Sequence, residues 1–422
     1  MPDSGNNKVL VLLIGEVLDD PRVYKTCLSL RDMGAEVTIA CTNPNFKPHR
    51  EIHRGLSIYR FPHRKEFFLK KFYHWLKGRL STEIEDIISP ESEKYVKTSI
   101  SAGIKNFILD LNFRHFMKST MKINRMMVKA FSGESFDLIH CNDVETLFAG
   151  NELRRYGVGK ALLYDSHEYW AGMGTPDRRS NRIMLETEAE GIKKTDYVVT
   201  VNPLIAERLM EQYNLDKKPS VILNCPYLCT DTEYLNIDMV HSPVRIIFHG
   251  KMQAYRGLPK LLLALKHCEN CVLTMSGYGP LKKSLELIAG KENISEKIIF
   301  TDRYKPEDSI KILGDHDIGI IPYEDIVLNN IYSSPNKLFE YAMAGLAVVA
   351  SNLPFIAGVV KENNMGEILP GTDPESIAES LNTLISDHER LILYKKNARK
   401  AAVESFSWEK QFTENYPWKP DN

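Results

Sequence analysis

The sequence predicts an α/β protein of two domains, each built on a parallel sheet, and three observations lead to this prediction. The chain has 422 residues, which is enough for two domains of ordinary size. Short apolar runs of strand length alternate with longer segments of helical periodicity along most of the chain. Residues 225–242 contain Pro and Asp with little periodicity, and they separate two such series. Strands that alternate with helices form parallel sheets covered on both faces, so each series predicts a Rossmann-like domain.

The first series opens with a predicted strand over residues 8–14, which is followed by Gly15. A helix is predicted from Pro21 to Met33, where Gly34 ends it, and a second strand over residues 36–41. Later strands are predicted at residues 136–140, 161–164 and 197–201. This series defines an N-terminal domain over residues 1–225.

The second series begins with a strand at residues 244–248. Further strands are predicted at residues 271–275, 297–300, 318–321 and 346–350. We therefore expect a C-terminal domain over residues 226–405. Residues 406–422 form a last segment, with a helix between Trp408 and Tyr416.

Charge and composition exclude several classes of protein. The net charge is −1, so the chain is not a nucleic-acid binder by bulk electrostatics. No apolar run reaches membrane-spanning length, and residues 1–7 are polar rather than signal-like, which predicts a cytoplasmic protein. Seven scattered cysteines suit a reducing compartment. The pairs Cys268/Cys271 and Cys225/Cys229 have no His at metal-ligand spacing, so incidental or buried thiols are favoured over a zinc site.

The most informative segment runs from Ser333 to Gly345 and is followed by an apolar strand. Ser334 is predicted as the N-cap of a helix, Pro335 as its first residue and Gly345 as its end. A helix that starts from a loop with free N–H groups can bind an anion such as a diphosphate. Glu340 lies too deep in this helix to cap it, but its carboxylate could accept hydrogen bonds from ribose hydroxyls. An ordinary amphipathic helix would show the same local pattern.

The sequence of this segment, SSPNKLFEYAMAG, closely resembles that of the donor-binding helix of the family-4 retaining glycosyltransferases. The resemblance extends over roughly nine-tenths of the chain. It implies the GT-B fold, in which two Rossmann-like domains face a central cleft and the last helix crosses back to the first domain. It also implies hexosyl or N-acetylhexosaminyl transfer, with retention, from a nucleotide-diphosphate sugar such as a UDP- or GDP-sugar. The acceptor would be a glycan, lipid-linked or small-molecule hydroxyl in polysaccharide, glycolipid or glycoconjugate biosynthesis, and neither cofactor nor metal would be required.

The resemblance also implies which residues bind the donor. Lys251 and Arg256 each stand beside a glycine after a predicted strand, where the family has two basic residues that contact the diphosphate. Solvated surface cations are the alternative. The full donor-binding set is Gly15, Lys251, Arg256, Arg303, Ser333, Ser334, Asn336, Lys337, Leu338 and Glu340. In place of the family's first glutamate, eight positions before Glu340, this chain has Tyr332, which leaves the sugar undetermined.

Three motifs of the first domain also resemble the family: DPRV after the first strand, DLIHCND ending at Asp143, and YDSHE ending at Glu168. Asn142 replaces the second His of the middle motif. His167 is predicted to lie at the carboxyl end of a strand, where open α/β sheets place their ligands. The predicted catalytic residues are Glu340, Asp143 and His167.

Asp315-His316-Asp317 looks like a metal-binding DxD, but it precedes a strand where the family has a structural aspartate, so no metal site is predicted. The stretch from 63 to 130 is rich in cations and aromatic rings. Residues 60–130 hold fifteen Lys and Arg against seven Asp and Glu. Such a segment can lie on an anionic membrane at the cytoplasmic face, or it can pack its rings on the first domain.

Two other functions keep the same architecture. A sugar-nucleotide epimerase would use the same diphosphate site with added acid/base carboxylates. A non-catalytic partner of an active glycosyltransferase would fit Tyr332 and Asn142 at two positions that are functional in the family. A dinucleotide-linked oxidoreductase is disfavoured, because the first strand is not followed by GxGxxG spacing.

Overall fold

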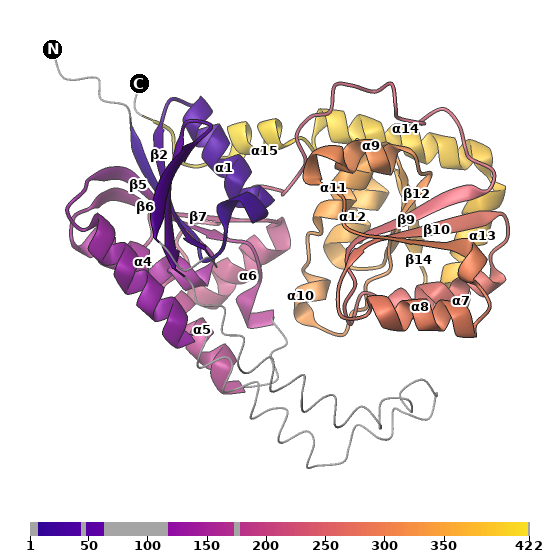
Figure 1. Ribbon diagram of the computed structural model, residues 1–422, viewed down its shortest axis with the longest axis horizontal. Helices are drawn as coiled ribbons and strands as arrows, with labels where there is room; N and C mark the ends of the chain where they lie inside the picture. Colours follow the sequence, from indigo (N-terminus) through magenta and orange to yellow (C-terminus); the bar gives the residue numbers. More distant parts are fainter. Residues whose placement is uncertain (1–6, 44–47, 63–116, 173–177, 421–422) are drawn as a thin grey trace. The chain divides into compact units, whose positions relative to one another are not determined.

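The computed structural model describes residues 7–43, 48–62, 117–172 and 178–420 (Figure 1). Most of the stretch predicted to contact either a membrane or the first domain, residues 63–116, lies outside this description. Its end belongs to a helical segment over residues 117–131.

The chain divides into two compact units. The first comprises Met1–Val198 and Trp418–Asn422, and the second comprises Val199–Pro417. The division falls within a strand of the first sheet. The domain limits expected at residues 225 and 405 remain predictions.

The first sheet has eight strands in the order β3-β4-β2-β1-β5-β6-β7-β8. Parallel pairing joins β1 to both β2 and β5, so apolar residues of β1 are covered by a strand on each side. The edge strand β3 pairs with β4 in the antiparallel direction, which departs from the predicted parallel arrangement. The strands are β1 (Lys8–Leu12), β2 (Glu36–Asn43), β3 (His49–His53), β4 (Leu56–Pro62), β5 (Phe136–Asn142), β6 (Gly159–Ser166), β7 (Tyr197–Thr200) and β8 (Ser220–Val221).

Helices follow these strands as predicted. The helix α1 begins at Pro21, because Asp20 caps it by accepting hydrogen bonds from the N–H groups of Arg22 and Val23. It packs against β2 and β4, whereas α4 packs against β5 and β6. The described helices after the strands of the first series are η1 (Val17–Asp19), α1 (Pro21–Asp32), α4 (Val144–Arg155), η5 (Trp170–Gly172), α5 (Arg178–Ile192) and α6 (Pro203–Tyr213).

The second sheet has six strands, all parallel where their pairing is described, in the order β11-β10-β9-β12-β13-β14. Its central strands are continuous apolar runs, as expected for a sheet that is covered on both faces. The strands are β9 (Val244–Lys251), β10 (Cys271–Tyr278), β11 (Ile298–Thr301), β12 (Ile318–Ile321), β13 (Ala347–Ser351) and β14 (Gly366–Leu369).

The helices of the second series bury their apolar faces in one continuous core with this sheet. Figure 1 shows α7 and α8 together beside one edge of the second unit, and α14 along another. The helices are α7 (Leu258–Ala264), η6 (Leu265–His267), α8 (Lys282–Lys291), η7 (Ser295–Lys297), η8 (Pro306–Asp308), α9 (Ser309–Gly314), α10 (Leu328–Ile331), α11 (Asn336–Met343), α12 (Pro354–Glu362), α13 (Pro374–Ser386), α14 (His388–Glu404) and α15 (Trp408–Asn415). No helix within the described ranges has the length and apolar character needed to cross a membrane.

Candidate active site

The helix α11 begins one residue later than the sequence predicts. Pro335 occupies the N-cap position with extended backbone (φ −71°, ψ 127°), and no side chain caps the helix. The predictions that Ser334 is the N-cap and Pro335 the first helical residue are therefore wrong. The Ser334 hydroxyl is instead buried without a hydrogen-bond partner in the described structure.

The end of α11 is as predicted. Gly345 adopts a left-handed conformation (φ +72°), and its N–H donates to Ala342 O. The N–H of Leu346 donates to Tyr341 O, which completes a Schellman motif. The Tyr341 hydroxyl also donates to Ile247 O of β9 at 3.2 Å, so the helix is fixed to the strand that carries the predicted basic turn.

Glycines bring the loops at the ends of β9 and β10 into close contact. Gly277 pairs with Gly250 and has φ +145°, and a Cβ on Gly277 would lie 2.0 Å from Gly250 O. Gly257 has φ +66°, and a Cβ there would lie 1.8 Å from Pro322 O. Only glycine fits both positions without movement of the backbone. The turn containing Lys251 and Arg256 is therefore fixed by its glycines.

Two cations of this region face aromatic rings. The Lys337 ammonium lies 3.7 Å from the ring centroid of Phe248 and 5.4 Å from that of Tyr323. The Arg256 guanidinium lies over the ring of the same Tyr323, 3.9 Å from its centroid. Neither side chain forms a hydrogen bond or ion pair with another residue within the described ranges. Lys337 is 7% exposed, and a Cβ on Gly250 would lie 3.4 Å from its Nζ.

The environment of Lys337 disfavours its charge. Burial lowers the pKa of Lys337 well below its usual value, the nearby charge of Arg256 lowers this pKa further, and the Glu340 charge opposes them without reversing the shift. A buried ammonium without an acceptor costs free energy, which an anion placed between the two cations would recover. This cluster therefore has the chemistry of an anion site.

Glu340 lies on the next turn of α11 beside a histidine that sequence reasoning missed. His249 Nε2 is 2.9 Å from Glu340 Oε2, which is an ion-pair distance. The two groups are not aligned for a hydrogen bond. The His249 ring lies between Tyr304 and Tyr341, with centroid distances of 5.5 and 5.3 Å. The Tyr304 hydroxyl is buried and has no hydrogen-bond partner within the described ranges.

The remaining residues of the predicted donor set have different surroundings. The Ser333 hydroxyl donates to Asn330 O at 2.8 Å, and Asn336 Oδ1 accepts from Asn224 at 3.0 Å. The Leu338 side chain is fully buried in the core, and its N–H donates to Pro335 O. Lys251 is exposed, and the exposed Arg303 guanidinium lies 5.9 Å from the ring centroid of Tyr278.

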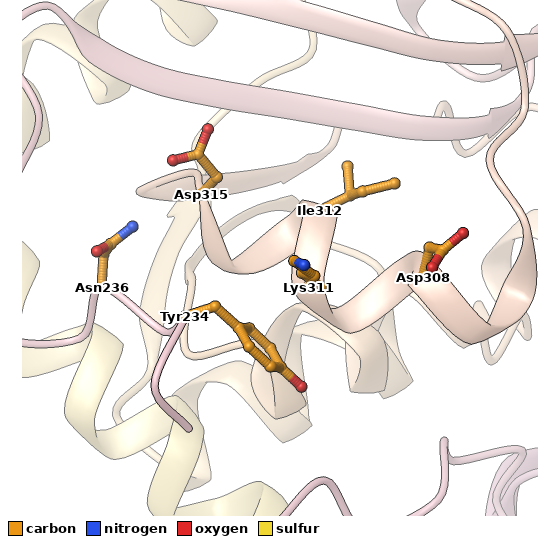
Figure 2. A pocket seen from close by; sticks show the side chains of 6 residues that line it. All are labelled: Tyr234, Asn236, Asp308, Lys311, Ile312 and Asp315. Atoms are coloured by element: carbon orange, nitrogen blue, oxygen red, sulfur yellow. The ribbon is translucent and has the colours of Figure 1, made fainter. Parts of the chain in front are cut away.

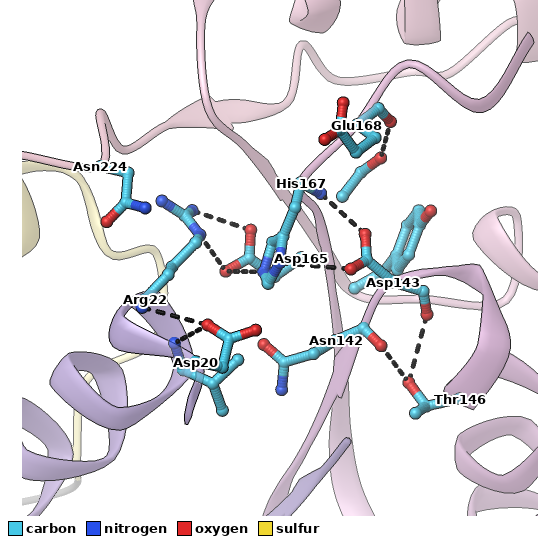
Figure 3. A network of polar contacts seen from close by, with 12 residues as sticks. Asp20, Arg22, Asn142, Asp143, Thr146, Asp165, His167, Glu168 and Asn224 are labelled. Carbon is cyan, nitrogen blue, oxygen red and sulfur yellow. Dashed lines mark hydrogen bonds and ion pairs between the residues drawn. The ribbon is translucent and has the colours of Figure 1, made fainter. Parts of the chain in front are cut away.

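In the first unit, a network of paired charges lies where β5 and β6 end (Figure 3). Arg22 of α1 donates to both carboxylate oxygens of Asp165 at 3.0 and 2.8 Å, and both side chains are almost fully buried. Burial alone would raise the pKa of Asp165, but the Arg22 charge holds it well below the usual value. The sequence motifs contained both residues, but neither was predicted to be a site residue.

The predicted catalytic residues Asp143 and His167 belong to this network (Figure 3). His167 Nδ1 lies 3.2 Å from Asp143 Oδ2, and its Nε2 lies 3.4 Å from Asp165 Oδ2. Burial would lower the pKa of His167, but the two carboxylates raise it well above the usual value. The two carboxylates therefore favour the protonated form of the His167 imidazole. Asp143 has φ +56°, a strained conformation for a residue with a Cβ.

Two further groups of this region are buried and unsatisfied. Asn142 Oδ1 and Glu145 Oε2 have no hydrogen-bond partner within the described ranges, although Asn142 Nδ2 donates to Leu12 O at 3.0 Å. Burial and the nearby charge of Asp143 raise the pKa of Glu145 to about 8. Gly15 belongs to the predicted donor-binding set and lies in the first unit, where its carbonyl accepts from Thr42 N at 2.9 Å.

In the DxD-like triplet, Asp317 is buried and paired with neighbouring groups. Asp317 accepts from the Lys395 ammonium at 2.7 Å and from the Arg245 N–H at 3.0 Å. Burial would raise the pKa of Asp317, but the Lys395 charge lowers it below the usual value. No cluster of three potential metal ligands occurs in the part of the chain that the structure describes. All seven cysteines are free thiols, and only Cys229 is not fully buried.

A separate shallow pocket lies beside α9 (Figure 2). It is lined by Tyr234, Asn236, Asp308, Lys311, Ile312 and Asp315. Its charged groups are of both signs, and Asp315 already pairs with Arg245 at 2.6 Å. None of its residues belongs to the predicted donor set.

Solved structures share this architecture along almost the whole chain. The sucrose-phosphate synthase of Thermosynechococcus elongatus is similar with a TM-score of 0.63 and 16% identity, over 97% of each chain. Anabaena HepE, solved in complex with UDP-glucose, gives a TM-score of 0.63 and 13% identity, over 96% of this chain and 97% of its own. The chain has the GT-B fold.

Sequence comparison agrees with this fold for the second GT-B domain. Residues 237–401 match the family described as Glycosyl transferases group 1. An uncharacterised glycosyltransferase of Methanocaldococcus jannaschii is 23% identical over 240 residues, which are 53% of this chain and 57% of that protein. The matched stretch thus spans less than two thirds of that relative. The similarity to glycosyltransferases in sequence is therefore strongest in the second GT-B domain.

Proposed function

We propose that this protein is a retaining glycosyltransferase that moves a hexosyl or N-acetylhexosaminyl group from a nucleotide-diphosphate sugar to an acceptor hydroxyl. The buried Lys337 side chain carries the proposal, because Lys337 and Arg256 both lie near the Tyr323 ring and neither forms an ion pair with a described carboxylate. A diphosphate supplies the missing negative charge. The Anabaena structure that contains UDP-glucose supports a nucleotide-sugar donor.

The reaction breaks the bond between the sugar's anomeric carbon and the diphosphate, and forms a bond from that carbon to the acceptor oxygen. Negative charge builds up on the departing diphosphate, so cations fixed beside it stabilise the transition state. Lys337 and Arg256 are held by aromatic rings, and the glycine-fixed turn places Arg256 before the donor arrives.

Among the described residues of the second unit, the Glu340 carboxylate contacts His249, and the Lys337 and Arg256 side chains lie together near Tyr323, where they can bind a departing diphosphate. This arrangement favours a mechanism in which the departing phosphate itself helps to take the acceptor proton. The acceptor loses its proton to that phosphate, and the sugar keeps its anomeric configuration.

The first unit would bind and orient the acceptor through Asp143 and the charged network around it. Its described charges are paired, with Arg22 on Asp165 and His167 between two carboxylates. We propose a glycan, lipid-linked or small-molecule hydroxyl as acceptor. Contact of residues 63–130 with an anionic membrane at the cytoplasmic face remains a prediction.

Calorimetric titration of UDP, GDP and their common sugar conjugates tests the donor site. We expect one nucleotide family to bind the wild type, with much weaker binding to Lys337→Met and to Glu340→Ala. Lys400→Met is the matched control, because Lys400 is an exposed lysine of the same unit. Absence of binding to the wild type at millimolar ligand would overturn the assignment.

The reaction class needs product analysis with and without acceptor. Transfer with retention gives a product whose anomeric configuration, read by NMR, matches that of the donor. Conversion of the donor to an epimer without acceptor would identify an epimerase instead. Nucleotide binding without turnover on any acceptor would favour the non-catalytic function.

A further inference from the structure

We infer that His249 is a positioning residue that holds the Glu340 carboxylate in the orientation needed to recognise the ribose of the donor nucleotide. The inference rests on the proposed function, which it extends by naming the residue that sets sugar discrimination in the nucleotide. Three observations on the described residues carry it.

The first observation is the contact itself. His249 Nε2 lies 2.9 Å from Glu340 Oε2, and these side chains are 13% and 24% exposed. A carboxylate has two oxygens and several acceptor positions, so one oxygen can rest on the imidazole while the other accepts from a ligand hydroxyl. The contact with His249 restricts the direction in which the Glu340 carboxylate points.

The second observation is that His249 cannot move freely. Its ring lies between Tyr304 and Tyr341, at 5.5 Å with an interplanar angle of 32° and at 5.3 Å with an angle of 73°. The backbone N–H of His249 also donates to the Tyr341 hydroxyl at 3.3 Å, which fixes the main chain at this residue. The side chain that contacts Glu340 is therefore held in place by packing, as accurate positioning requires.

The third observation points to a ligand. The Tyr304 hydroxyl is buried without a partner within the described ranges, and it lies close enough to Glu340 for that charge to raise its pKa, in addition to the effect of burial. An unsatisfied buried hydroxyl costs free energy unless another group reaches it. A ribose bound at Glu340 would bring hydroxyl groups to this place.

The test compares ribose and deoxyribose nucleotides. Whichever of UDP and GDP binds the wild type is titrated beside its 2′-deoxy and 3′-deoxy analogues. We expect the wild type to prefer the ribonucleotide to at least one analogue, and we expect His249→Phe to reduce this preference by about tenfold, a size within the range of coupling between two side chains in contact. Phe keeps the ring between the two tyrosines but cannot contact the carboxylate through nitrogen.

Two controls separate positioning from structural damage. His249→Gln keeps a donor and should retain most of the preference, and binding of inorganic pyrophosphate should stay unchanged in both variants. In Glu340→Gln, the further change His249→Phe should have little additional effect on the preference, because the two residues act together.

The inference is overturned if His249→Phe keeps the wild-type preference, or if it weakens pyrophosphate as much as nucleotide. A wild type that binds nucleotides without any ribose preference also overturns it, while leaving the proposed donor site standing. A wild type that binds no nucleotide overturns the proposed function, and this inference falls with it.

Discussion

The two charged clusters of this protein use ionic groups in opposite ways. In the first unit, Arg22, Asp165 and His167 are buried against one another, and each positive charge faces a carboxylate. In the second unit, Lys337 and Arg256 lie against aromatic rings and no described carboxylate pairs with either. Paired charges fix a local structure, whereas cations without counter-charges lower the stability of the protein and are suited to bind an anion. The difference predicts which substitutions affect folding and which affect binding.

Breaking the paired cluster should have the largest effect on stability. In Asp165→Asn the buried Arg22 guanidinium loses its carboxylate, so we expect the free energy of unfolding to fall by about 3–5 kcal/mol. Urea unfolding of the variant and the wild type measures this change in the free energy of unfolding. Asp238→Asn is the control, since that exposed carboxylate pairs with Lys396 at the surface and should cost no more than about 0.5 kcal/mol. Equal losses of stability in the two variants would contradict the claim that the buried pair matters more to stability than the exposed pair.

Removing a cation from the second cluster should weaken ligand binding without lowering stability. Lys337→Met keeps an unbranched side chain near Phe248 and removes a buried charge, so the melting temperature should stay level or rise. Affinity for the nucleotide should fall by about 100-fold, the scale of a charge-assisted hydrogen bond in a buried site. Thermal melting and calorimetry on one preparation give both values. A loss of stability with unchanged affinity would remove the basis for the anion site.

The pH dependence of stability tests the carboxyl group beside the paired cluster. Because the pKa of Glu145 is raised to about 8, the folded protein keeps a proton that the unfolded chain releases above its ordinary pKa of 4.5. Stability should therefore fall as the pH rises from about 4.5 to 8, and Glu145→Gln should be more stable than the wild type at pH 8, by about 1 kcal/mol. Melting at pH 5 and pH 8 measures the difference.

Some pH dependence should remain in Glu145→Gln. The pKa of His167 is also raised, so its stabilising contribution is complete below the unfolded value of 6.5 and is lost as the pH rises through the folded value. An identical pH profile for wild type and Glu145→Gln would show that Glu145 is ionised in the folded protein.

The smallest effect is expected at the start of α11. The Ser334 hydroxyl is buried without a partner and does not cap the helix, so Ser334→Ala should change stability by less than about 0.5 kcal/mol. A true N-cap would cost about 1 kcal/mol. Chemical unfolding of this variant beside the wild type distinguishes the two, and a loss of the larger size would restore the N-cap prediction.

Periodicity and turn residues were sufficient to predict most of the fold. All strands expected from apolar runs are present, and Gly345 ends α11 as predicted. The strands β3, β4, β8 and β14 were not predicted. Three of them have only two to five residues and give little local signal, whereas β4 has seven residues that mostly alternate between buried and half-buried and could have been found from this pattern. The error at Ser334 arose because Pro335 can also occupy the N-cap position with extended backbone.

The candidate site was predicted less completely. Lys337, Arg256 and Glu340 followed from a motif, whereas His249, Tyr304 and Tyr323 did not, since they come from separate loops and strands and carry no common spacing. The same holds for Arg22 and Asp165, which are 143 positions apart in the chain and share one buried pair of hydrogen bonds.

The sequence alone determined the two α/β series, the glycine-bearing turns and the residue types available to bind a diphosphate. These properties depend on local backbone preference and on hydrophobic periodicity, which act over a few residues. Only the tertiary structure decided which cations are neutralised and which are not, because burial and the distance between charges set that balance. The contrast between Arg22 on a carboxylate and Lys337 on a ring is of this kind.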